Sequence, residues 1–197
     1  MTTRIAIFAS GSGSNAENIV RYFNEHPIIC VSLIVSNRQD AFVLQRAKQL
    51  GIPSVVHPKA DWLSGEPVLR TLREHQIDFI VLAGFLLRVP ECLLITYPYR
   101  IINIHPALLP KYGGKGMYGS RVHEAVVAAH ETESGITIHY VNERYDEGII
   151  IRQERCPVTP ADTPDDVAER VHALEYRYFP STIEDVIASC DALSFAP

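Results

Sequence analysis

The stretch that decides the fold is Arg4-Ile5-Ala6-Ile7-Phe8-Ala9-Ser10-Gly11-Ser12-Gly13-Ser14-Asn15. Its first half, Arg4 to Ala9, is a short apolar run, which predicts a buried strand. The glycines and serines follow at once, and residues from about Ala16 to Glu25 have helical spacing. A strand, a glycine loop and a helix in direct succession are typical of a parallel α/β sheet.

The same alternation continues through the first half of the chain. Residues 41–50 have helical spacing closed by Gly51, the residue expected just past a helix end, and residues 67–75 also read as a helix. Further strands are predicted at residues 28–35, 53–56, 77–83 and 101–104. Strands that are apolar on both faces and alternate with helices predict a doubly wound, mostly parallel sheet with helices on both faces.

The second half of the chain departs from this alternation. After a helical segment at residues 122–129, strands are predicted at residues 136–141 and 148–158. The loop between them, residues 142–147, is short, which predicts an antiparallel pair. Thr163-Pro164-Asp165-Asp166 has the capping residue, first-turn proline and acids of a helix start, and we expect this helix to reach about Tyr178.

Composition limits the classes of function. The 197 residues suit one α/β domain, residues 1–197, and no Ser/Pro-rich linker divides them. The formal net charge is −5, so no basic field indicates a nucleic-acid partner. We expect a soluble, cytoplasmic protein, because the amino end lacks a signal-peptide pattern and no run approaches a membrane span. Four scattered cysteines without a CxxC pair predict reduced thiols and no zinc site.

Three segments should meet beyond the carboxyl ends of the parallel strands, where such folds bind ligands: Gly11–Asn15, Gly84–Val89 and Asn103–His105. The first offers backbone N–H groups and hydroxyls at a helix amino end, which favours a phosphate. It also fits G-x-G-x-x-A, the pattern of a dinucleotide site, but the second strand ends at Ser36-Asn37 without the acid that would hold a ribose. The alternative is a simple turn.

Asn103 and His105 alternate on one strand, so both side chains should project into one space. An amide donor beside an imidazole is what a developing oxyanion requires. Asp146, in a glycine-ended loop, could reach the imidazole and hold it protonated. The competing interpretations are a core histidine for His105 and an ordinary turn acid for Asp146.

The other histidines give weaker signals. His139 could face the same site with Thr137, although core packing is equally consistent with the pattern. His123 receives no role. No spacing of histidines predicts a metal site. Four histidines in polar or turn contexts are expected to face solvent: His26, His57, His75 and His130.

Taken together, these residues resemble the folate-dependent phosphoribosylglycinamide formyltransferases of purine biosynthesis. The matching segments run in the family's order over most of the chain: Gly11–Asn15, Val81–Phe85, Asn103–Pro106 with Leu108–Tyr112, Gly135–Val141 and Asp146–Gly148. The resemblance implies a Rossmann-like formyltransferase fold and a one-carbon transferase. It implies transfer of the formyl group of 10-formyltetrahydrofolate to the amino group of glycinamide ribonucleotide, without a metal, and it leaves a homodimer open.

The resemblance also assigns roles to residues. The implied catalytic trio is Asn103, His105 and Asp146. The ribonucleotide would be held by its phosphate at Gly13, Ser14 and Asn15, and by its sugar and amine at His172, Ala173, Leu174 and Glu175. The folate would be bound by Leu86, Leu87, Arg88, Val89, Asn103, Asn142, Glu143, Arg144, Tyr145 and Asp146.

The chain departs from the family pattern in three places. The basic residue of Leu86-Leu87-Arg88 is shifted by one position, and an arginine expected ahead of the strand at Ile77 has no counterpart. The loop at residues 113–119 is longer than in some relatives. Alternative functions are a methionyl-tRNA formyltransferase or a formyl-folate hydrolase, each of which carries an added domain, an NAD-dependent oxidoreductase, and a non-catalytic phosphosugar-binding protein.

Overall fold

The structure is a computed structural model that describes the backbone of residues 2–194 and the side chains of residues 2–190. Its strands form one sheet in the order β3-β2-β1-β4-β5-β6-β7. They are β1 Thr3–Phe8, β2 Ile29–Ser36, β3 Ser54–Val56, β4 Phe79–Leu82, β5 Ile101–His105, β6 Glu133–Tyr140 and β7 Ile150–Pro157. The helices are α1 Ser14–Tyr22, α2 Val43–Leu50, α3 Asp61–Ser64, α4 Glu66–Glu74, α5 Glu91–Thr96, α6 Ser120–Ala128 and α7 Pro164–Ser194.

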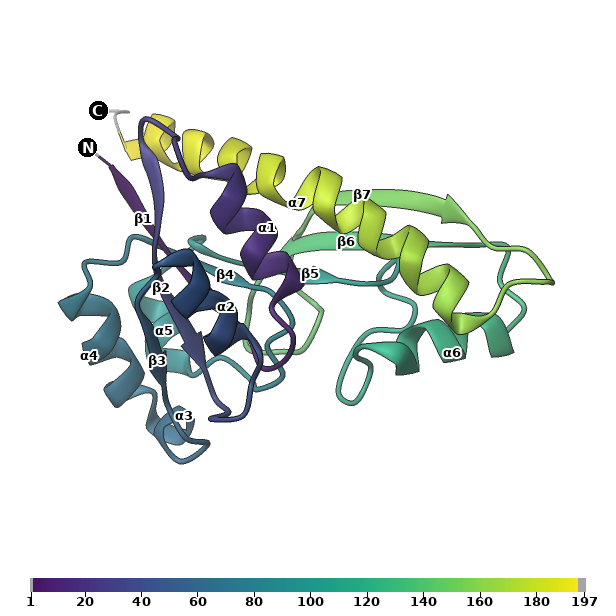
Figure 1. Cartoon of the computed structure of the whole chain (residues 1–197), viewed down its shortest axis with the longest axis horizontal. Helices are drawn as coiled ribbons and strands as arrows, with labels where there is room; N and C mark the ends of the chain where they lie inside the picture. The colour runs from purple at the N-terminus through teal and green to yellow at the C-terminus, as the bar shows by residue number, and fades with distance from the viewer. Residues whose placement is uncertain (1, 195–197) are drawn as a thin grey trace.

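The sheet is covered by helices on both faces, as the sequence predicts (Figure 1). Alternate residues of β1 enter two separate cores, because successive side chains of a strand point to opposite faces. Ile5 and Ile7 pack with residues of α1, α2, α6 and α7. Ala6 and Phe8 pack with residues of α3, α4 and α5. The short helices α3 and α5 have no counterpart among the predicted elements.

Strands β1 to β5 pair in parallel, and β6 and β7 add an antiparallel part to the edge of the sheet. The predicted antiparallel pair is therefore confirmed. Strand β6 also pairs with β5, and this register sets Asn103 opposite His139 and His105 opposite Thr137. The antiparallel edge thus brings a second polar strand beside the Asn103–His105 segment.

The prediction that the last helix ends near Tyr178 is wrong. Helix α7 continues past Pro180 to Ser194 and runs alongside α1 and the β6–β7 edge (Figure 1). A proline inside a helix leaves the carbonyl four residues earlier without its usual N–H donor. Here that carbonyl belongs to Tyr176, and the Asn18 Nδ2 atom donates to it at 3.0 Å. Continued burial beyond the proline, at Ile183 and Ile187, stabilises the extension.

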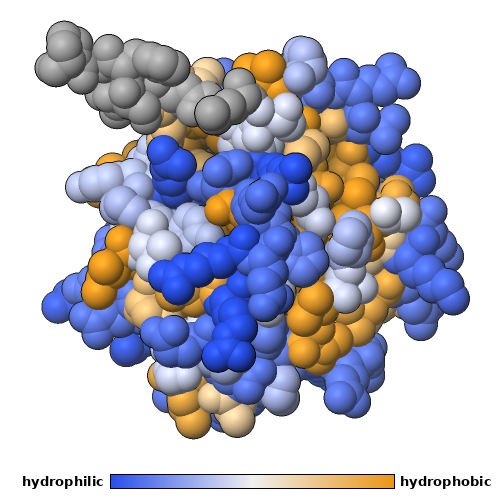
Figure 2. Space-filling model, turned by 90° about the vertical axis from the view of Figure 1, so that its left-hand side faces the viewer, coloured by the Kyte–Doolittle hydropathy of each residue, from blue (hydrophilic) through white to orange (hydrophobic). Residues whose placement is uncertain are grey.

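On the face shown in Figure 2, polar and apolar side chains are interspersed. Within the described chain, no helix is both long enough and apolar enough to span a bilayer.

Candidate active site

The carboxyl ends of β1, β2 and β4 are joined by hydrogen bonds through Ser10. Its backbone N–H donates to the Gly84 carbonyl at 3.1 Å, and its hydroxyl donates to Asn37 Oδ1 at 2.6 Å. The hydroxyl also accepts from the Leu86 N–H at 3.0 Å. Two of the three segments that were predicted to form one site are therefore physically connected. Asn37 stands where a dinucleotide site would place its acid, and its carbonyl oxygen is engaged by Ser10.

Four polar side chains converge at the end of β5. Asp146 Oδ2 lies 3.6 Å from His105 Nδ1, and Asp146 Oδ1 lies 3.5 Å from Asn103 Nδ2 and 3.6 Å from His139 Nε2. Asn103 Nδ2 is also 3.1 Å from His139 Nε2. The side chains of His105, His139 and Asp146 are 5%, 3% and 11% exposed, so this group is shielded from water. The trio Asn103, His105 and Asp146 lies together as predicted, and His139 joins it.

His139 is the residue of this group that sequence reasoning left undecided. Its Nδ1 atom lies 2.8 Å from the Tyr140 carbonyl, which fixes the proton on Nδ1 and leaves Nε2 to accept from the Asn103 amide. That contact orients the amide. The available signal was the period of two along β6, which could not distinguish the site from the core.

His105 has a partner on each ring nitrogen. Its Nε2–H donates to the Tyr112 carbonyl at 2.7 Å, while Nδ1 faces Asp146. Burial lowers the pKa of His105, and this effect outweighs the opposing influence of the Asp146 charge and the Tyr112 carbonyl, so that the pKa lies below its ordinary value. The predicted pairing with Asp146 is present and favours the charged imidazole, while desolvation of the nearly enclosed ring acts against it and is the larger effect on the pKa.

Asp146 is held as a carboxylate. Burial raises its pKa, but the neighbouring His139 and His105 and the Gly114 N–H, 2.8 Å from Oδ2, together bring the pKa below its ordinary value. The backbone of Asp146 is in the left-handed region, φ 58°, which aspartate tolerates better than most residues. Gly148 allows the loop to return against the sheet, since a Cβ there would meet the Tyr140 carbonyl oxygen.

The glycine loop and α7 form a second polar group. Gly13, φ 75°, is the residue before α1, and its missing Cβ leaves room for Val43. Asn15 Nδ2 donates to Glu175 Oε2 at 2.8 Å, and His172 Nε2 lies 4.0 Å from the same oxygen. Burial raises the pKa of Glu175, against the influence of the Asn15 hydrogen bond and His172. Ala173 and Leu174 lie apart from this group, because Ala173 is exposed and Leu174 packs against the core.

Beside the β5 end, a cavity of about 50 Å³ has most of the predicted folate residues in its walls. Leu86 and Glu143 are the exceptions, since Leu86 binds Ser10 through its N–H and Glu143 is exposed. The walls from the predicted set are Leu87, Arg88, Val89, Asn103, Asn142, Arg144, Tyr145 and Asp146.

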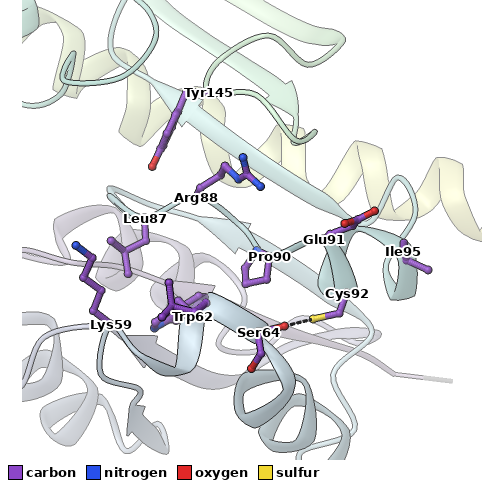
Figure 3. A pocket seen from close by; sticks show the side chains of 11 residues that line it. Lys59, Trp62, Ser64, Leu87, Arg88, Pro90, Glu91, Cys92, Ile95 and Tyr145 are labelled. Atoms are coloured by element: carbon purple, nitrogen blue, oxygen red, sulfur yellow. Dashed lines mark hydrogen bonds between the residues drawn. The ribbon is translucent and has the colours of Figure 1, made fainter.

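A larger cavity, of about 660 Å³, adjoins the first and shares Leu87, Arg88 and Tyr145 with it (Figure 3). In this view Leu87 lies between Lys59 and Arg88, above the ring of Trp62. Two cations and an aromatic face thus line a hollow that continues from the β5 end. Sequence reasoning missed Lys59, because nothing in its local pattern distinguishes it from a surface lysine.

The prediction that His57 faces solvent is wrong. His57 is 8% exposed, and its ring nitrogens lie 2.8 Å from Asp61 Oδ2 and 2.9 Å from Thr71 Oγ1. The ring therefore links α3 to α4 by hydrogen bonds. This tertiary role could not be predicted from the position of His57 in a turn. Among the described residues, no three His, Cys, Asp or Glu side chains are grouped to hold a metal.

Comparison with known proteins decides the family. A family model described as formyl transferase matches residues 3–183. The chain belongs to the formyl transferase family. Its resemblance to phosphoribosylglycinamide formyltransferases is confirmed by relatives of that name.

The formyl transferase from Bacillus subtilis is 35% identical over 93% of this chain and 94% of its own length. The chloroplastic relative from Arabidopsis thaliana is 41% identical over 95% of this chain, and the match spans 65% of that protein. The match to the Vigna unguiculata relative spans 60% of that protein's length. The crystal structure of the Bacillus halodurans phosphoribosylglycinamide formyltransferase has a TM-score of 0.86 and 37% identity, and covers 98% of this chain and all of its own. This structural neighbour confirms the predicted fold.

Proposed function

We propose that this protein transfers the formyl group of 10-formyltetrahydrofolate to the amino group of glycinamide ribonucleotide, giving N-formylglycinamide ribonucleotide and tetrahydrofolate. The observation that carries the proposal is the convergence of Asn103, His105, His139 and Asp146 at the end of β5. The glycine loop leads into α1, whose amino end favours an anion, and the two cavities share lining residues, the smaller one adjoining this group through Asn103, His139 and Asp146. The names of the relatives support the same reaction.

In the proposed reaction the uncharged amine attacks the formyl carbon, and the carbonyl oxygen becomes an oxyanion. Asn103 Nδ2–H and the Nε2–H of His105 are the two donors for that oxygen. Donors of this kind typically lower a barrier by on the order of 3 kcal/mol each.

The Nε2–H of His105 is already committed to the Tyr112 carbonyl. It must leave that carbonyl to reach the oxyanion, so the segment that carries Tyr112 moves when substrates bind. The tetrahedral intermediate then collapses by breaking the bond between the formyl carbon and the folate nitrogen. One proton passes from the attacking amine to the departing nitrogen, and Asp146 is placed to relay it through a water.

The larger cavity suits the aminobenzoyl-glutamate part of the folate. Trp62 and Leu87 offer apolar surface to an aromatic ring, and Lys59 and Arg88 offer charge to glutamate carboxylates. Lys59 would then supply the positive charge that relatives obtain from the arginine ahead of Ile77, which has no counterpart in this chain.

No nucleic-acid or membrane partner is part of this proposal, and a homodimer remains open. A cytoplasmic location stays an expectation, since the plant relatives are named chloroplastic.

The test is a spectrophotometric assay of the purified protein with 10-formyltetrahydrofolate or its dideaza analogue. We expect a folate product only when glycinamide ribonucleotide is added. Product formation without the ribonucleotide would indicate a hydrolase, and no product with it would refute the proposal.

A further inference from the structure

Three enclosed side-chain atoms of the described residues have no hydrogen-bond partner. They are Asn15 Oδ1, His123 Nδ1 and Ser134 Oγ. More than nine in ten buried polar groups in folded proteins have a partner, because an unpaired one loses its hydration without compensation. Asn15 belongs to the anion-binding loop. His123 has so far no function.

His123 differs from the other buried histidines of the described chain. Both ring nitrogens of His57 and of His139 have hydrogen-bond partners, and His105 has a partner on Nε2 and a carboxylate beside Nδ1. His123 is 3% exposed, yet no hydrogen bond of the described residues uses either of its nitrogens. The buried face of α6 is otherwise apolar, with Val122 and Val126 beside His123. Packing alone therefore does not explain a polar side chain at this position.

The position of His123 connects the two polar groups of the site. It lies on α6, which packs against α7, the helix that carries His172 and Glu175. Both His172 and His105 are close enough for their charges to act on it. A polar series therefore runs from Asn15 through Glu175, His172 and His123 to His105. Its first and fourth members hold the unpartnered atoms.

Burial lowers the pKa of His123, and His172 and His105 lower it further. The lowered pKa favours the uncharged form of the ring. An uncharged imidazole carries one donor and one acceptor. The glycinamide group of the proposed substrate has both N–H donors and a carbonyl acceptor.

We propose that His123 is a substrate-binding residue of this site, and that its ring hydrogen bonds to the glycinamide end of the ribonucleotide. This inference rests on the proposed function. The ribonucleotide would lie with its phosphate at Gly13–Asn15 and its amine near His105, and His123 would hold the segment between them. By fixing the glycinamide, it directs the amine toward the formyl carbon.

The test compares folded variants of the full chain. His123→Phe keeps a planar ring and removes both hydrogen-bonding nitrogens, whereas His123→Asn and His123→Gln restore an amide near Nδ1 or Nε2. His130→Asn, at an exposed histidine just past α6, is the matched control. Calorimetric titration gives the Kd of glycinamide ribonucleotide, steady-state kinetics give KM for each substrate, and thermal unfolding verifies the fold.

We expect His123→Phe to raise both Kd and KM of the ribonucleotide on the order of tenfold or more, since an unpaired substrate group would remain buried. The KM of the folate should stay within about twofold. One of the two amide variants should recover part of the affinity, and His130→Asn should behave as wild type. Should the phenylalanine variant not fold, His123→Leu is measured in its place.

An unchanged Kd and KM of the ribonucleotide in a folded variant would overturn the inference while the wild type still formylates the ribonucleotide. If the wild-type protein itself neither binds nor formylates glycinamide ribonucleotide, the proposed function fails instead. The two failures are therefore distinguishable.

Discussion

The Asp146 carboxylate lies 3.6 Å from Nδ1 of His105, on the side of the ring opposite the nitrogen that binds the Tyr112 carbonyl. The imidazole is thus oriented from both sides before any substrate arrives. Asp146 Oδ1 also lies 3.5 Å from Asn103 Nδ2, which donates to it, and 3.6 Å from His139 Nε2, so one carboxylate adjoins the amide and both imidazoles. The following predictions test what this arrangement does.

Replacing Asp146 by asparagine should lower kcat by at least on the order of 100-fold with little change in the fold, because the carboxylate that faces His105 Nδ1 and accepts from the Asn103 amide becomes a neutral amide. Steady-state kinetics measure the loss. Glu147→Gln is the matched control, since this neighbouring acid is exposed and its ion pair is with Arg144. Similar kcat values for the two variants would show that Asp146 acts as an ordinary turn acid.

Removing the cations of the larger cavity should weaken folate binding. Lys59→Ala and Arg88→Ala should each raise the KM of the folate several-fold, more for substrates with several glutamates, because each removes a charge facing the carboxylates. High salt screens these charges, so it should reduce the difference in folate KM between each variant and wild type. Lys48→Ala, on α2, is the control. A KM that does not depend on the number of glutamates would exclude this cavity as the tail site.

Gly148→Ala should reduce both stability and kcat, because the new Cβ meets the Tyr140 carbonyl oxygen and must displace the loop that carries Asp146. Gly51→Ala offers a comparison: Gly51 has φ 70° with no atom near its Cβ position, so only backbone strain of about 1 kcal/mol is expected there. Denaturant unfolding and kinetics separate the effects. The claim fails if Gly148→Ala keeps wild-type kcat.

Stability should depend on pH through His123. Its pKa in the folded protein is lowered, so below about pH 6.5 the unfolded chain binds more protons than the folded one. The free energy of unfolding therefore loses this contribution as the pH falls from about 6.5 toward the folded pKa. His123→Phe should gain stability relative to wild type between about pH 7.5 and about pH 5.5. The raised pKa of Glu175 changes stability with pH in the opposite direction. This contribution is present in wild type and in His123→Phe, so it cancels when their unfolding free energies are subtracted. If the unfolding free energies of wild type and His123→Phe change in parallel with pH, the lowered pKa of a buried His123 is contradicted.

The extension of α7 past Pro180 should depend on Asn18. Asn18→Ala removes the donor to the Tyr176 carbonyl and should cost about 1 kcal/mol of unfolding free energy. In a Pro180→Ala background the helix regains its own N–H donor, so the same substitution should cost less. An equal cost in both backgrounds would show that the Asn18 contact does not replace the missing bond.

The parts of this molecule that could be predicted from the sequence follow local periodicity. The period of two placed Asn103 and His105 on one face, and apolar runs with glycine loops predicted the parallel sheet. Features that depend on contacts between residues far apart in the chain could not be predicted from local patterns. The continuation of α7 past Pro180 depends in part on Asn18, 158 residues before Tyr176, and the pKa of His105 is lowered mainly by its enclosure. That residues 1–197 form a single domain stays a prediction.

The most direct measurement of the central claim is single-turnover formyl transfer to glycinamide ribonucleotide by wild type and His105→Ala, with both substrates saturating. We predict that the variant binds the ribonucleotide with an unchanged Kd and transfers the formyl group on the order of 100-fold to 1,000-fold more slowly, since it lacks the second oxyanion donor. A folded His105→Ala that transfers at the wild-type rate would contradict the account.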